Sequence, residues 1–92
     1  MSKKRFSNIW DAIEDTPQEA ASLRIRAELM IALQEHIKNT GLTQAQAAKL
    51  IGVTQPRISD LMRGKINLFS LESLIGMVTG IGLSIELTLK AA

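Results

Sequence analysis

The chain has 92 residues, 46% of them hydrophobic and 22% charged, a composition typical of one small globular domain. It contains no cysteine, which excludes disulfides, zinc–cysteine sites and thiol chemistry and fits a reducing cytoplasm. Residues 73–85, the longest uncharged stretch, are too short for a bilayer span of about 20 apolar residues. The basic cluster at residues 3–5 leads into acids, so no signal peptide is expected.

The net charge of +2 hides an uneven distribution of charge along the chain. Residues 6–20 hold four acids and no base, whereas residues 49–65 hold four bases and one acid. An acidic block beside a basic block indicates two surfaces with different partners. A mixed, solvated surface is the alternative interpretation.

Two helices are predicted in the first part of the chain. Ser7 or Asn8 is placed to cap a short helix that runs to about residue 15. Residues 16–19 then combine a capping threonine, a proline and a glutamate, which is a helix start. Apolar residues recur at helical spacing behind this start until Gly41, so we expect a long helix over residues 17–39.

Three shorter helices are predicted further along the chain. Each begins at a hydroxyl N-cap: Thr43, Thr54 and Ser70. The first of them ends before Gly52, the second is closed by Gly64, and the third runs to about Gly80. Phe69 and Leu74 are spaced as a hydrophobic staple around the last N-cap.

The C-terminal segment changes from helical to alternating periodicity. Its apolar residues are separated by single polar ones: Leu83, Ile85, Leu87 and Leu89. This spacing predicts a β-strand within residues 83–92, with one apolar face. No other segment predicts a strand, so we expect it to pair antiparallel with the same strand of a second copy. An amphipathic helix end or a frayed tail is the alternative.

Residues 44–63, QAQAAKLIGVTQPRISDLMR, show the pattern of two helices that cross at a steep angle. The predicted shared core is Ala47, Ile51, Val53, Ile58 and Leu61. Ala48 lies where only a small side chain fits, and Gly52 where the chain reverses with a positive φ. The spacing resembles the helix-turn-helix of phage-repressor and Cro-like proteins. We therefore expect a mainly all-α, Cro-like bundle with a C-terminal strand that pairs between protomers.

The polar residues that this core leaves outside predict contacts with DNA. The candidates for base contacts are Gln55, Pro56, Arg57 and Asp60. Gln55 suits adenine, Pro56 a thymine methyl and Arg57 guanine. Asp60 either accepts from a cytosine amine or orients Arg57 or Arg63. The candidates for phosphate contacts are Gln44, Lys49, Thr54, Arg63 and Lys65. A helical hairpin that has lost its ligand is the alternative.

A homodimer is expected because one helix-turn-helix makes few contacts with DNA. Such proteins normally bind two half-sites about 34 Å apart. The predicted strand, through its apolar face, supplies the dimer independently of this argument. The expected organisation is an arm with a short helix over residues 1–16, a helical domain over 17–82 and a dimerisation strand over 83–92.

The predicted N-terminal helix carries an apolar stripe that suits a partner protein. The stripe lies at positions i, i+3, i+4 and i+7: Phe6, Ile9, Trp10 and Ile13. A helix of this format can lie in a groove of a partner, with Trp10 as the anchor. The same stripe would serve equally well to pack on its own domain, and the residues alone leave both interpretations open.

The chain as a whole is similar to small bacterial XRE-family regulators of the HigA antitoxin type. The similarity lies in residues 6–12, 42–45, 53–65 and 68–71, of which VTQPRISDLMRGK at 53–65 is the most specific. It implies a cytoplasmic dimeric repressor that neutralises a RelE/HigB-like toxin through its N-terminal arm and represses their shared promoter. A regulator without a toxin and a protein-interaction module with a scaffold-only helix-turn-helix are the alternatives.

An enzyme is not expected, and no cofactor or metal is implied. His36 is the only histidine, so no pair of histidines can hold a metal ion. None of the serines has a plausible base, and the glycines at 76, 80 and 82 do not match a phosphate-binding loop.

Overall fold

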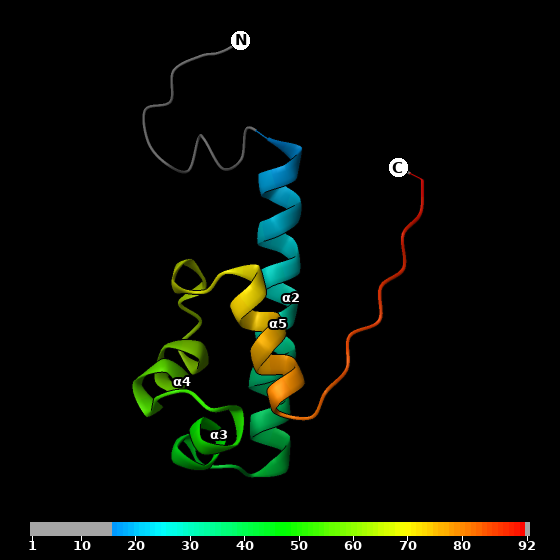
Figure 1. Cartoon of the computed structure of the whole chain (residues 1–92). Helices are drawn as coiled ribbons and strands as arrows, with labels where there is room; N and C mark the ends of the chain where they lie inside the picture. The colour runs from blue at the N-terminus through cyan, green and yellow to red at the C-terminus, as the bar shows by residue number, and fades with distance from the viewer. Residues whose placement is uncertain (1–15, 92) are drawn as a thin grey trace, which may run out of the picture.

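The computed structural model describes residues 16–91, which form helices followed by an extended C-terminal tail. The elements are α2 (Pro17–Thr40), α3 (Gln44–Ile51), α4 (Gln55–Met62), the 3₁₀ helix η1 (Ile66–Leu68) and α5 (Leu71–Gly80). Figure 1 shows α2 as the long axis of the molecule, with α5 beside it and α3 and α4 grouped toward one end. The predicted arm and its short helix lie outside the described residues, apart from residue 16.

The four helix starts predicted within residues 16–91 are confirmed, because local capping decides them. At each start the N-cap side-chain oxygen accepts a hydrogen bond from the backbone N–H three residues later: Thr16, Thr43, Thr54 and Ser70. At Thr43 the cap is reciprocal, since the Thr43 N–H also donates to Gln46 Oε1 at 2.9 Å. Each such cap contributes roughly 1 kcal/mol to helix stability.

One hydrophobic core joins all four α-helices of the described region. It contains Met30, Leu33, Ile37, Ala47, Ala48, Ile58, Leu61, Phe69, Leu74, Met77, Val78 and Ile81. Within residues 16–91 no polar or charged side chain is buried. Helix α5 approaches the end of α3 closely, because a Cβ added at Gly80 would lie 3.4 Å from the Ile51 carbonyl oxygen. The core therefore fixes how α3 and α4 are presented on α2 and α5.

The C-terminal segment differs from its prediction, since residues 83–91 form no strand within the described chain. Its last backbone hydrogen bond among the described residues runs from the Leu83 N–H to the Val78 carbonyl oxygen at 3.0 Å. The tail then extends alongside α2 and α5 without a ladder partner (Figure 1). A strand needs a second strand, and residues 16–82 provide none. The expected pairing between two copies stays a prediction.

A helix that crosses a membrane must be long and predominantly apolar. Over residues 16–91, no helix combines the length and the apolar character needed to cross a bilayer.

Candidate nucleic-acid interface

The turn between α3 and α4 has the geometry that the sequence predicts. Gly52 has φ of 90°, a left-handed conformation that side chains other than glycine rarely adopt. The N–H groups of Gly52 and Val53 both donate to the Ala48 carbonyl oxygen, at 2.8 and 3.0 Å. Ala47 and Ala48 are buried against the other helices. Small residues and a glycine therefore set the angle at which α4 leaves the turn.

The first turns of α3 and α4 meet at an open hollow of about 440 Å³, the polar hollow, which is lined by three polar residues and one proline. Gln44 of α3 and Gln55, Pro56 and Ser59 of α4 line it. Gln55 and Pro56 are exposed, and the start of a helix carries a partial positive charge from its free N–H groups. The structure thus brings together two predicted base contacts and one predicted phosphate contact.

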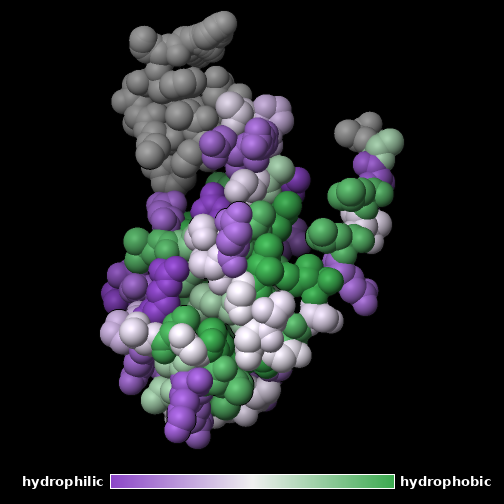
Figure 2. All heavy atoms as spheres, in the orientation of Figure 1, coloured by the Kyte–Doolittle hydropathy of each residue, from purple (hydrophilic) through white to green (hydrophobic). Residues whose placement is uncertain are grey.

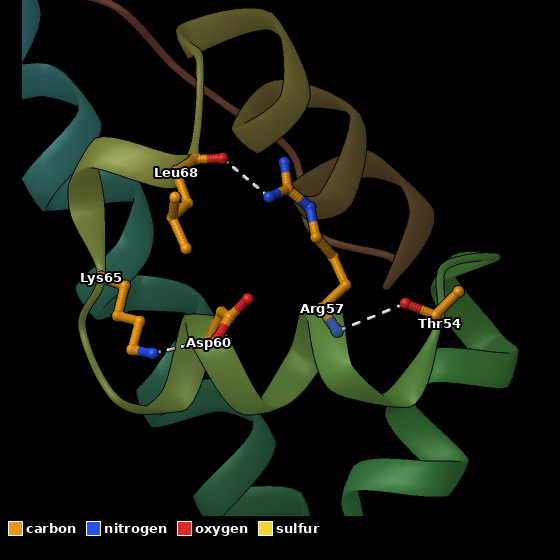
Figure 3. Close-up of polar contacts among 5 residues, drawn as sticks. All are labelled: Thr54, Arg57, Asp60, Lys65 and Leu68. Carbon is orange, nitrogen blue, oxygen red and sulfur yellow. Dashed lines mark hydrogen bonds and ion pairs between the residues drawn. The ribbon is translucent and has the colours of Figure 1, made fainter.

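Arg57 contacts the connection between α4 and α5 and does not line the polar hollow. Its Nη1 donates to the Leu68 carbonyl oxygen at 2.7 Å (Figure 3). Its guanidinium carbon lies 3.9 Å from the centre of the Phe69 ring. A cation over an aromatic face adds about 0.5–1 kcal/mol at exposed sites. The bond to Leu68 uses one of five guanidinium N–H groups, so a role for Arg57 at a base or a phosphate stays a prediction.

Asp60 pairs with Lys65 rather than with Arg57 or Arg63, its predicted partners. Asp60 Oδ1 lies 3.6 Å from Lys65 Nζ (Figure 3), and the Lys65 N–H donates to the Asp60 carbonyl oxygen at 3.1 Å. The chain turns back after α4 at Gly64, whose φ is 75°. This turn brings Lys65 to Asp60 while Leu68 and Phe69 engage Arg57. Such a surface ion pair contributes about 0–1 kcal/mol.

The predicted phosphate contacts do not all gather at the polar hollow. Lys49 lies on another shallow hollow with Leu42, Gln46 and Leu50. Thr54 is exposed, and its hydroxyl oxygen accepts from the Arg57 N–H at 3.3 Å as the N-cap of α4. Arg63 and Lys65 are exposed beyond the other end of α4. The predicted phosphate-binding cations are therefore divided between α3, which carries Lys49, and the turn after α4, which carries Arg63 and Lys65.

Two residues of α2 that sequence analysis missed donate hydrogen bonds, one to the helix-turn-helix and one to the connection that follows it. Gln34 Nε2 donates to the Leu61 carbonyl oxygen at 2.8 Å, near the end of α4. Arg26 Nη1 donates to the Phe69 carbonyl oxygen at 3.3 Å, one residue beyond the carbonyl that Arg57 holds. Both occupy helical positions on the apolar stripe that includes Met30. A polar residue on a core-facing stripe requires a hydrogen-bond partner, and this signal could have found them.

Two other sites were predicted outside residues 44–63 of the sequence. The stripe predicted to bind a toxin, Phe6, Ile9, Trp10 and Ile13, lies outside the described residues. Of the predicted dimerisation residues, Leu83 packs against the core, and Ile85, Leu87 and Leu89 are exposed.

A family model described as a helix-turn-helix domain matches residues 12–90. The chain belongs to this helix-turn-helix family. A solved structure with the provisional name of XRE-family transcriptional regulator is similar, with 28% sequence identity and a TM-score of 0.72. The similarity covers 80% of this chain and 83% of that one. No curated protein matches the chain. The mainly helical Cro-like fold and the XRE-type helix-turn-helix are thus confirmed.

Proposed function

We propose that this helix-turn-helix protein is a sequence-specific DNA-binding transcriptional repressor and has no catalytic activity. The observation that supports it most is the exposed first turn of α4, which presents Gln55 and Pro56 beside Gln44 at an open polar hollow. In this proposal α4 lies in the major groove with that turn toward the bases. The name of the similar regulator agrees with this role.

Some of the exposed side chains are proposed to contact the DNA bases, and others the phosphate backbone of the DNA. Gln55 can make two hydrogen bonds to adenine, and Pro56 can contact a thymine methyl. The cations around α4 supply attraction to phosphates, to which Gln44 and Thr54 add hydrogen bonds. The ion pair with Asp60 positions Lys65 to contact the phosphate backbone of the DNA. Arg57 steadies α4 against the following connection and has donors left for DNA.

The protein binds DNA as a homodimer in this proposal. One helix of eight residues reads only a few base pairs, and two copies would read half-sites about 34 Å apart. Pairing of the C-terminal tails is the proposed contact between the copies, because their apolar side chains are exposed.

Toxin neutralisation is the finer part of the proposal. The resemblance to HigA-type antitoxins and the acidic, apolar N-terminal segment support a RelE/HigB-like toxin as partner in the cytoplasm. Trp10→Ala is expected to weaken toxin binding in calorimetry while DNA binding is retained. An unchanged toxin affinity would favour a stand-alone regulator of the same family.

DNA titrations at several salt concentrations test the central function. We expect Gln55→Ala to lose roughly tenfold or more in preference for the DNA upstream of its own gene over unrelated DNA. Gln18→Ala is the matched control, because Gln18 is exposed on the first turn of α2. Wild-type affinity should fall steeply with salt. Equal affinity of the wild-type protein for both DNAs would contradict the proposed repressor and favour the protein-interaction module.

A further inference from the structure

The C-terminal tail borders an apolar hollow of about 240 Å³ that residues 16–91 leave unfilled. Ile25 of α2 and Ile75 of α5 line it from one side, and Ile85 and Leu87 of the tail from the other. Figure 2 shows hydrophobic side chains on both the helical body and the tail that stands beside it. Leu89, farther along the tail, is 90% exposed. Apolar surface of this kind on both sides of a hollow indicates an interface.

We infer that the tails of two copies pair antiparallel in one register, centred on Thr88, with Glu86 of each copy opposite the partner's Lys90. This inference rests on the proposed homodimer and specifies how its two chains meet. It commits the exposed tail to a second copy of this chain rather than to another protein.

The alternation of apolar residues removes half of the possible registers. Residues directly opposite each other in an antiparallel ladder have their side chains on the same face. Residues 85, 87 and 89 are apolar, whereas 84, 86, 88 and 90 are polar. One apolar face therefore forms only if odd positions stand opposite odd positions, which puts the two-fold axis at a residue.

The two charges of the tail select among the registers that remain. A centre at residue 86 would put Glu86 opposite the partner's Glu86, and a centre at 90 would oppose two lysines. A centre at 87 puts Glu86 opposite the partner's Thr88 and forms no ion pair. Only a centre at Thr88 pairs Glu86 with the partner's Lys90, and symmetry forms this ion pair twice. Opposite charges across a ladder stabilise it, and like charges destabilise it.

This register also suits the hollow beside α2 and α5. It puts Leu87 opposite the partner's Leu89 on the face of the tail that already lines the hollow. The paired tails would then cover apolar surface of both copies and satisfy backbone groups that the single tail leaves without internal partners.

Cysteine cross-linking tests the register directly, because the chain has no cysteine of its own. Thr88→Cys brings the two introduced thiols together at the axis, within the Cα separation of roughly 4.4–6.8 Å that disulfides need. Ser84→Cys is the control, since Ser84 is exposed, takes no part in the ion pair, and its two copies would lie about 27 Å apart along the ladder. We expect the Thr88→Cys variant to cross-link at least tenfold faster than the Ser84→Cys variant under mild oxidation. Equal rates, or faster cross-linking of the Ser84→Cys variant, would overturn the register.

Light scattering and DNA binding on the same samples separate this inference from the proposed function. A Thr88→Cys dimer that binds DNA but does not cross-link overturns the register and leaves the function intact. A monomer that does not bind DNA overturns both.

A charge exchange provides an independent measurement of the same pairing. Glu86→Lys and Lys90→Glu each put like charges opposite each other, so each dimer should dissociate roughly tenfold more readily. Mixing the two variants restores both ion pairs, and the heterodimer should form at wild-type strength. A mixture no stronger than either variant alone would overturn the inferred register.

Discussion

The helix-turn-helix and the C-terminal tail both contain apolar residues at regular spacing, but these residues differ greatly in their exposure to solvent. Leu61 of α4 is fully buried, whereas Leu89 of the tail is 90% exposed. In residues 43–63 caps, turn and core partners all come from the same chain. The tail has the alternation of a strand, but residues 16–91 supply no second strand to pair with it. The helix-turn-helix is thus completed by contacts within the described residues, whereas the tail makes no strand contact among them.

The same substitution in the two regions should give the largest contrast. Leu61→Ala leaves a cavity in the core and should lower the free energy of unfolding by about 2–5 kcal/mol. Leu89→Ala, measured at concentrations where the protein is monomeric, should change it by less than about 0.5 kcal/mol. Denaturant unfolding measures both. Similar losses for the two variants would contradict this distinction between core and tail.

The tail should instead be sensitive to loss of a backbone donor. Ile85→Pro removes an N–H that the ladder needs, so we expect a predominantly monomeric protein with operator binding weakened at least tenfold. The free energy of unfolding of the monomer should be unchanged, because the Ile85 N–H makes no internal bond in the described chain. Light scattering gives the oligomeric state, with Ile85→Val as the control. A dimeric proline variant would exclude the proposed contact.

The turn of the helix-turn-helix can be tested by comparing alanine substitutions of two glycines, for which we predict stability changes of opposite sign. Gly52→Ala meets no atom within 4 Å but forces a side chain to φ of 90°, which costs about 1–2 kcal/mol of stability. Gly76→Ala, also in open space but inside α5, should stabilise by about 0.5–1 kcal/mol. Thermal unfolding compares the two. A neutral Gly52→Ala would mean that the turn tolerates another backbone conformation.

Replacing Arg57 should lower stability less than replacing the buried Leu61. Arg57→Lys keeps the charge but loses the planar group that reaches the Leu68 carbonyl and stacks on Phe69. We expect a loss of about 1 kcal/mol in denaturant unfolding. If stability is unchanged while preference for the operator disappears, Arg57 acts at the bases and does not steady the α4–α5 connection.

The sequence could predict what depends on neighbouring residues, such as the helix starts at Thr43 and Thr54 and the turn at Gly52. Capping and left-handed turns use atoms within a few positions, and these residue types are characteristic of them. The partners of Arg57 and Asp60 could not be predicted, because they depend on how the chain returns after Gly64 through η1. Gln34 was predictable in principle, since it interrupts an apolar stripe. The conformation of the tail could not be predicted, because alternating apolar residues do not specify which segment a strand pairs with.

Operator spacing tests the central claim, that two copies present matching α4 helices to successive turns of one DNA duplex. We would insert five base pairs, about half a helical turn, between the half-sites of the operator and measure affinity by fluorescence anisotropy. The account predicts that the five-base-pair insertion lowers affinity to the non-specific level, because the half-sites then face opposite sides of the duplex. An insertion of about ten base pairs puts them on the same side again, so affinity should recover if the DNA bends enough for the dimer to reach both half-sites. Unchanged affinity after the five-base-pair insertion would contradict it, because separate single subunits would then be enough.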